Sequence, residues 1–165
     1  MARSPIIGVM GPGEQATSVE QQLAYELGQA IAIAGWALLT GGRNQGVMDA
    51  ASRGAKSQGG LTIGILPQSD RGGLSAAVDI PILTGMGNAR NVINVLTSDG
   101  VIACGMGSGT ASELALAIKV KRPVILLQVP PTAQAFFQSL APDRVWVADH
   151  VPMAIALVQQ VLQLM

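Results

Sequence analysis

The chain has 165 residues, of which 49% are apolar and 12% are charged, and its ten Lys and Arg residues balance ten Asp and Glu residues. This length predicts one domain spanning residues 1–165, and the zero formal charge without a basic cluster argues against nucleic-acid binding. The single cysteine, Cys104, excludes an internal disulfide and a cysteine-rich metal site.

The low proportion of charged residues predicts a homo-oligomer. Soluble domains contain roughly 25% charged residues, so this chain has little charge with which to cover its whole surface. The N-terminal apolar run IIGVM is too short for a signal peptide and is soon followed by Pro12. Since no segment approaches the roughly 20 apolar residues of a membrane span, we expect a cytoplasmic protein without membrane contact.

Apolar segments of strand length alternate with longer segments of helical periodicity. The expected strands are 6–10, 36–40, 61–66, 78–83, 100–104, 123–127 and 145–148. The expected helices are 18–34, 46–58, 88–97, 109–121, 132–140 and 152–164. Several strands are apolar at successive positions, as in strands covered on both faces. The pattern predicts an α/β fold with a doubly wound, mostly parallel sheet of about seven strands and helices on both faces.

Four of the expected strand-to-helix turns are rich in glycine. They read GPGEQATS (11–18), TGGRNQG (40–46), TGMGNARN (84–91) and GMGSGT (105–110). Each turn leads to a helix whose first N–H groups are unpaired and favour an anion, and glycine lets a ligand approach the main chain. We therefore expect a phosphate seat that includes Gly11, Thr40, Gly41, Gly42, Gly46, Gly107, Ser108, Gly109 and Thr110. The alternative for any single turn is that glycine serves tight packing alone.

Two common nucleotide-binding motifs are absent from these turns. The chain has no G-x-x-x-x-G-K-S/T sequence, and its first turn is G-x-x-G-x-G rather than G-x-G-x-x-G. The second expected strand ends in WALLTGG, without an acidic residue to bind a ribose. These differences disfavour a dinucleotide-dependent dehydrogenase.

Two charged residues accompany the glycine turns. Arg90 lies in the first turn of an expected helix, where a cation is unfavourable unless an anion binds beside it. Glu113 follows Gly109 by four residues and has three open interpretations: an acid stabilised by the helix dipole, a ligand-binding or catalytic carboxylate, or an ion-pair partner of Arg90. Arg43 is equally compatible with anion binding and with solvent exposure.

Three other residues have structural interpretations. Asp99 is expected to tie a turn at the start of a strand, and Cys104 is expected to be a packed thiol. His150 has no partners at metal-binding spacing, so a helix-capping role is expected. No metal site is predicted.

The segments TGGRNQGVMDAASRGA, MGNARNVINVLTSDGVIA and GSGTASELALAIKVKRPVILL resemble the SLOG superfamily of Rossmann-like proteins. That superfamily includes the lonely-guy phosphoribohydrolases, once described as lysine decarboxylases, and relatives of DNA-processing protein A. The motifs are most similar to those of the molybdenum cofactor carrier proteins. The phosphoribohydrolase motif P-G-G-x-G-T-x-x-E is matched by GMGSGTASE at Gly107, Gly109, Thr110 and Glu113.

The resemblance implies one of two functions for this site. As a carrier, the protein would bind molybdenum cofactor, a phosphorylated pterin, through the glycine turns, Arg90 and Glu113, without ligating the metal directly. As a nucleoside 5′-monophosphate phosphoribohydrolase, it would use Arg90 and Glu113 as catalytic residues. Gly105 and Met106 replace the proline and first glycine of the hydrolase motif, which favours the carrier. The resemblance also implies a homodimer or a homotetramer.

Overall fold

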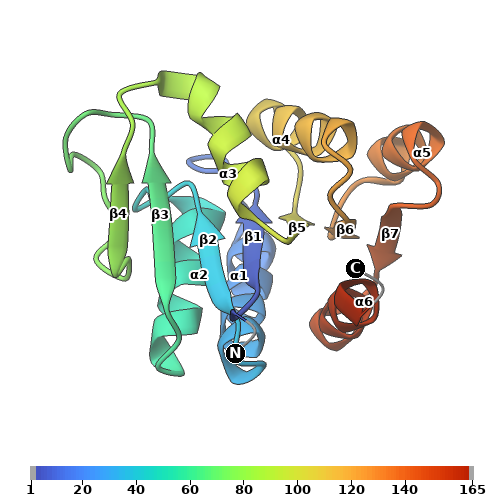
Figure 1. Ribbon diagram of the computed structural model, residues 1–165, viewed down its shortest axis with the longest axis horizontal. Helices are drawn as coiled ribbons and strands as arrows, with labels where there is room; N and C mark the ends of the chain where they lie inside the picture. Colours follow the sequence, from blue (N-terminus) through green and yellow to red (C-terminus); the bar gives the residue numbers. More distant parts are fainter. Residues whose placement is uncertain (1–2, 164–165) are drawn as a thin grey trace.

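The protein forms one fully parallel, seven-stranded sheet in a computed structural model that describes residues 3–163. The strands are β1 (Ile6–Met10), β2 (Ala37–Thr40), β3 (Thr62–Leu66), β4 (Ile80–Leu83), β5 (Gly100–Cys104), β6 (Val124–Leu127) and β7 (Val145–Ala148). Their order is β4-β3-β2-β1-β5-β6-β7, which runs from left to right in Figure 1. The predicted α/β fold is confirmed, and every strand pair is parallel rather than most of them.

Helices cover both faces of the sheet. They are α1 (Ser18–Ile33), α2 (Gly46–Ser57), α3 (Asn91–Thr97), α4 (Ser108–Lys119), α5 (Pro131–Leu140) and α6 (Val151–Gln163). Helices α1, α2 and α6 share one buried apolar cluster with the sheet, and α3, α4 and α5 share another. In Figure 1, α6 accordingly lies on the opposite side of the right half of the sheet from α4 and α5. No helix within residues 3–163 has both the length and the apolar character that would let it cross a membrane.

The expected helix at 88–97 is divided in two. It begins with a 3-10 segment, η1 (Gly87–Arg90), and continues as α3. Gly87 begins this segment with a positive φ of 55°, a conformation that glycine adopts at little cost. Strands β1, β5 and β7 match the expected ranges, and the other elements differ from expectation by one or two residues at one or both ends. Residue 164 of the last expected helix lies outside the described residues.

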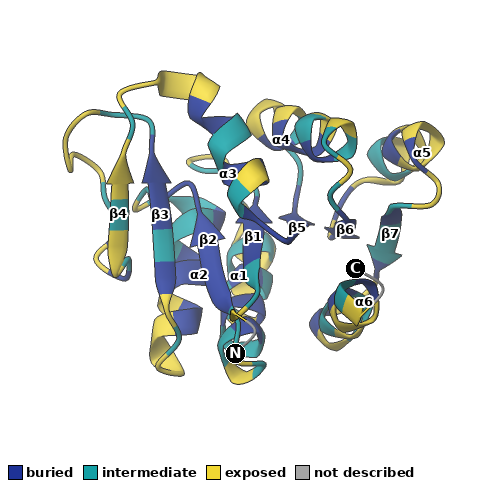
Figure 2. Ribbon diagram, viewed as in Figure 1, coloured by how far each residue is buried: buried dark blue, intermediate teal, exposed yellow. Residues whose placement is uncertain are grey.

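Burial along the strands explains the apolar runs, with one exception. Every residue of β2, β5 and β6 is buried. In the edge strand β4, by contrast, Ile80, Ile82 and Leu83 are 40–45% exposed (Figure 2). This strand begins at Ile80 rather than residue 78 because Asp79 is held in the preceding turn, where its carboxylate accepts from the backbone N–H and hydroxyl of Thr62.

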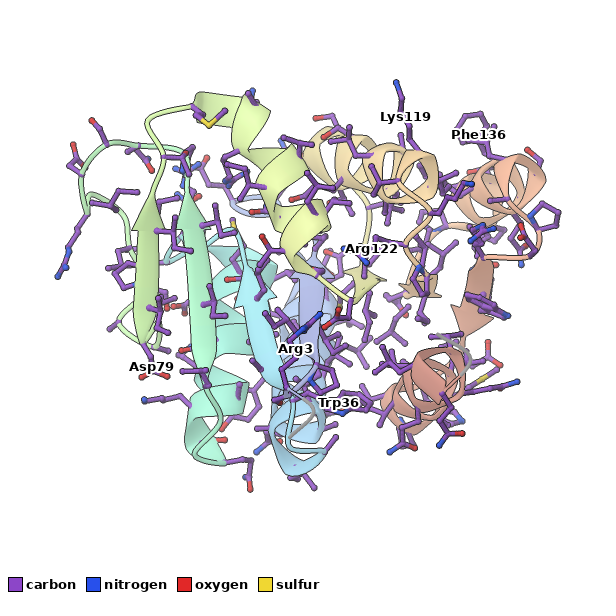
Figure 3. The ribbon with its side chains drawn as sticks, in the orientation of Figure 1. Arg3, Trp36, Asp79, Lys119, Arg122 and Phe136 are labelled. Carbon is purple, nitrogen blue, oxygen red and sulfur yellow. The ribbon has the colours of Figure 1, made fainter. Side chains whose placement is uncertain are left out.

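Two carboxylates fix the amino ends of the strands. Asp99 accepts from the backbone N–H of Ile6 at 2.9 Å and from the guanidinium of Arg3. The hydrogen bond from Arg3 is the main cause of the lowered pKa of Asp99. Asp79 pairs with Lys56, and that ion pair is the main cause of its lowered pKa. Arg3 and Asp79 both lie toward the lower ends of the strands in Figure 3. The structural role expected for Asp99 is confirmed.

Two further side chains have the structural roles expected of them. His150 caps α6 by accepting from the backbone N–H of Met153 at 3.1 Å. Cys104 is fully buried, and burial raises the pKa of its thiol to about 12. Neither residue takes part in the site described below.

Helices α1 and α2 approach each other through glycine. A Cβ on Gly28 would collide with the carbonyl oxygen of Ala51, and a Cβ on Gly54 would collide with that of Tyr25. Backbones this close exclude any side chain at either position, so these glycines serve packing.

Replacing Gly28 by Ala is expected to lower the free energy of unfolding by about 1–3 kcal/mol, the usual effect of overpacking. The effect opposes the higher helix propensity of Ala, which is worth roughly 1 kcal/mol. Gly100→Ala is the control, because no atom lies within 4 Å of the added Cβ and φ is not positive. Urea denaturation measures both variants, and an unchanged or more stable Gly28→Ala protein would contradict the packing account.

Candidate functional site

A cleft of about 430 Å³ opens at the carboxyl ends of the strands, beside β1 and β5. Strand order reverses between these two strands, and α1 and α4, which follow them, cover opposite faces of the sheet. Such a reversal is where open parallel sheets bind ligands. Of the residues expected from the sequence, the structure brings together Gly11, Gly41, Arg90, Gly107, Ser108, Gly109, Thr110 and Glu113 around this cleft.

Thr40, Gly42 and Gly46 were expected in the phosphate seat, and they do not line the cleft. Thr40 is fully buried, and its hydroxyl accepts from the backbone N–H of Gly42 at 3.1 Å. Gly42 has a φ of 77° and lies against the backbone of Gly64, while Gly46 has a φ of 50° and lies against Gly13. These contacts within the protein account for the threonine at 40 and the glycines at 42 and 46. The interpretation that such residues serve packing alone therefore applies to these three.

Gly107 and Gly109 differ from the other glycines of the turns. A Cβ on Gly109 would meet no atom within 4 Å, and a Cβ on Gly107 would meet only Pro12 Cγ at 3.9 Å. Both residues line the cleft, and the space beside their Cα atoms is open. By contrast, Gly105 has a φ of 82° and is packed against the Glu20 side chain. Protein packing therefore requires glycine at 105 and does not require it at 107 or 109.

The N-terminus of α4 carries uncapped N–H groups. Gly107 is the N-cap residue and has no side chain to accept from them, and the N–H of Ala111 bonds to the Gly107 carbonyl at 2.8 Å. No partner among the described residues accepts from the N–H groups of Ser108, Gly109 and Thr110. Helix α1, in contrast, is closed by a Thr17–Glu20 capping box. Three donors and the positive end of a helix dipole thus meet at one wall of the cleft.

Arg90 supplies a buried cation to the same cleft. Arg90 is 9% exposed, its Nε donates to the carbonyl oxygen of Ile65 at 2.8 Å, and its Nη1 donates to Asn91. A Cβ on Gly41 would lie 2.8 Å from Nη2, so the absence of a side chain there makes room for the guanidinium. Burial lowers the pKa of Arg90, Glu113 opposes that shift, and Arg43 adds to it. No carboxylate within residues 3–163 forms an ion pair with it.

Glu113 lines the same cleft and lies against Asn94. It is 7% exposed, and Asn94 Nδ2 donates to its Oε1 at 2.8 Å. Burial raises the pKa of Glu113 to about 7, against the opposing effects of the Asn94 hydrogen bond and the Arg90 charge. The direct Arg90–Glu113 ion pair, one of the alternatives left open by the sequence, is not formed between these described residues.

Several cleft residues were missed or left open by the sequence. Gln45, Met48 and Asn88 line the cleft. Gln45 and Asn88 belong to the glycine turns, but no sequence feature distinguished them from the other polar residues of those turns. Arg43 also lines it, and its buried Nε has no hydrogen-bond partner in the described part of the chain. No sequence pattern marked Asn94 as a residue of the site, because its role depends on the packing of α3 against α4. No three His, Cys, Asp or Glu side chains among the described residues are placed to share a metal ion.

The family model described as the SLOG cluster4 family matches residues 4–155. The chain belongs to the SLOG cluster4 family. Two solved structures match this member of the family over nearly its whole length. One is the molybdenum cofactor binding protein of Rippkaea orientalis, with a TM-score of 0.95, 56% identity and coverage of 98% of this chain and 99% of that one. The other is the molybdenum cofactor carrier protein of Chlamydomonas reinhardtii, with a TM-score of 0.93, 52% identity and the same coverage.

A more distant relative represents the hydrolase branch. The cytokinin riboside 5′-monophosphate phosphoribohydrolase of Mycobacterium tuberculosis is 36% identical over 95 residues, which is 56% of this chain and 51% of that protein. The chain thus matches about half the length of that relative and nearly all of the two cofactor-binding structures. The resemblance of this SLOG cluster4 protein to molybdenum cofactor carriers is confirmed.

Replacing Arg90 by Met is expected to raise the pKa of Glu113 above 7, because removing the cation removes its attraction for the carboxylate. Carbon-13 NMR of labelled glutamate side chains measures this pKa, with Glu113→Gln identifying the signal. Arg53→Met removes an exposed cation of α2 and is expected to leave the pKa of Glu113 unchanged. An unchanged pKa in Arg90→Met would show that the two side chains do not share one electrostatic environment.

Proposed function

We propose that this protein binds molybdenum cofactor and serves as its carrier. The observation that carries the proposal is the open space beside Gly107 and Gly109, which neighbouring protein atoms do not fill. The proposal is supported by the two cofactor-binding structures that match 98% of the chain. The cleft volume of about 430 Å³ also falls within the roughly 300–1,000 Å³ typical of small-molecule sites.

The phosphate of the cofactor is assigned to the wall formed by α4. The free N–H groups of Ser108, Gly109 and Thr110 would donate to its oxygens, and the Arg90 guanidinium would balance its charge. The pterin would then occupy the rest of the cleft, where Met10 and Met48 are among the lining residues and provide apolar contact. Each of these groups is held by the fold before the ligand arrives, so little ordering is needed on binding.

Hydrolysis of a nucleoside 5′-monophosphate is the second candidate. It is favoured by one observation, which is a buried carboxyl group, Glu113, with a pKa of about 7 in the same cleft as Arg90. In that reaction Arg90 would orient the phosphate, and the Glu113 carboxylate would stabilise an oxocarbenium-like ribose while water attacks the anomeric carbon. The free base would leave with a proton from solvent.

Replacing Gly109 by Asp is expected to weaken molybdenum cofactor binding at least about a hundredfold, because a carboxylate would occupy the phosphate position and repel it. The open space around Gly109 allows the variant to keep the stability of the parent protein. Equilibrium binding under anaerobic conditions measures the effect. Gln138→Asp, which adds the same charge on exposed α5, is the matched control.

The same proteins, incubated with AMP, distinguish the two candidates. A carrier releases no adenine, whereas a hydrolase releases adenine in a reaction that Glu113→Ala abolishes. Adenine release together with unchanged cofactor binding in Gly109→Asp would replace the carrier function with the hydrolase function.

A cytoplasmic location and a lack of nucleic-acid binding remain predictions. We also propose that the protein is a homo-oligomer. Large apolar side chains are exposed on both the β4 edge and the outer helices, and they include Leu96, Phe136 and Leu140 at more than half exposure. Figure 3 shows Phe136 directed away from the body of the protein. Light scattering is expected to give a mass of two or four chains, and the mass of one chain would refute the proposal.

A further inference from the structure

The Glu113 carboxyl group has one oxygen engaged by the protein and one left for the cleft. Asn94 is fully buried on α3, and its Nδ2 donates to Glu113 Oε1 at 2.8 Å. No hydrogen bond within the described residues reaches Oε2, although Glu113 lines the cleft. Oε2 is therefore the oxygen through which this side chain can contact a ligand.

The orientation of the Asn94 amide shows where a proton on Glu113 would lie. Asn94 directs its Nδ2 toward Glu113 even though its own Oδ1 is buried without a hydrogen-bond partner in the described part of the protein. Glu113 Oε1 acts as an acceptor in this contact. A neutral carboxyl group in the same position keeps Oε1 as its carbonyl oxygen and carries its proton on Oε2.

An anionic ligand favours that neutral form. Ser108, Gly109 and Thr110 begin the helix that also carries Glu113, and all four residues line one cleft. A phosphate at those amides and a carboxylate at Glu113 would repel each other in a partly desolvated space. Protonation removes the repulsion and turns Oε2 into a donor, as in other buried carboxylic acids that bind oxyanions.

We propose that Asn94 is a positioning residue that fixes the Glu113 carboxyl group so that its Oε2, in the protonated form, donates a hydrogen bond to the phosphate of the bound ligand. Binding of the anion then takes up a proton at Glu113. The inference rests on the proposed function, since it assigns a role in binding the phosphorylated ligand. It extends the site to a residue that lies outside the cleft lining.

The charged groups around Glu113 are few and come from different elements. Arg90 faces it from η1, and Arg43 and Glu14 line the same cleft from the turns after β2 and β1. Neither α3 nor α5 carries a titratable side chain. Burial places the pKa of Glu113 at about 7, so its protonation changes in the neutral range.

The test compares the dissociation constant of molybdenum cofactor for the parent protein, Glu113→Gln and Asn94→Leu between about pH 6 and about pH 8.5. The ligand phosphate itself titrates near about pH 6. At each pH, the dissociation constant of each protein is therefore divided by that of Glu113→Gln, and this ratio is free of the titration of the ligand. Gln at 113 keeps the Oε1 acceptor and replaces the Oε2 donor with an amide N–H. Circular dichroism checks folding, and Asn94→Ser is used if Asn94→Leu does not fold.

The ratio for the parent protein is expected to be constant below the pKa of Glu113 and to rise by up to about tenfold per pH unit above it. In Asn94→Leu the ratio should be several-fold higher at low pH, and its rise should move to higher pH, because a hydrogen bond that favours the carboxylate is lost.

A ratio that does not change with pH, or an Asn94→Leu profile identical to that of the parent, overturns this inference and leaves the carrier function intact. Failure of the parent protein to bind the cofactor at every pH contradicts the proposed function and the inference together.

Discussion

Strand order reverses between β1 and β5, so the helices that follow these strands leave toward opposite faces of the sheet. The space between their N-termini cannot be closed by either helix, and it becomes the cleft. One of the two, α1, satisfies its own first N–H groups with a Thr17–Glu20 capping box. The other, α4, has a glycine as its N-cap residue, and its first N–H groups have no acceptor among residues 3–163. This asymmetry makes the wall formed by α4 suited to an anion.

The charges in the cleft follow from that wall. The buried guanidinium of Arg90 forms no ion pair with a carboxylate of residues 3–163, and such a charge is unfavourable unless an anion completes the site. Glu113 lies nearby and does not fill that role, because burial raises its pKa and no ion pair forms with Arg90. Hydrogen bonds from Arg90 to Ile65 and Asn91 hold the guanidinium in place. Arg90 and Glu113 thus share the cleft without forming an ion pair with each other.

The sequence predicted the sheet, its helices and the wall of the cleft because these depend on local patterns. Continuous apolar runs mark strands buried on both faces, and glycine with small polar residues marks the start of α4. The sequence could not separate Gly109 from Gly42, because both are glycines in similar turns. One faces open space and the other packs against Gly64, a difference that depends on which strands are neighbours.

Contacts between elements account for what the sequence missed. Asn94 lies in the middle of a short apolar helix, where it resembles any other buried polar residue until α3 and α4 are brought together. The start of β4 likewise depends on Asp79 contacting Thr62 across the loop, which no local pattern reveals. Positions set by hydrogen bonds between distant segments require the fold to be known first.

The central claim is that the free N–H groups at the start of α4 hold the phosphate of the ligand. A crystal structure of the protein loaded with molybdenum cofactor tests it most directly. The account predicts phosphate oxygens within about 3.2 Å of the backbone nitrogens of Ser108, Gly109 and Thr110, with the Arg90 guanidinium beside them. A phosphate bound elsewhere, with these nitrogens still free, would contradict it.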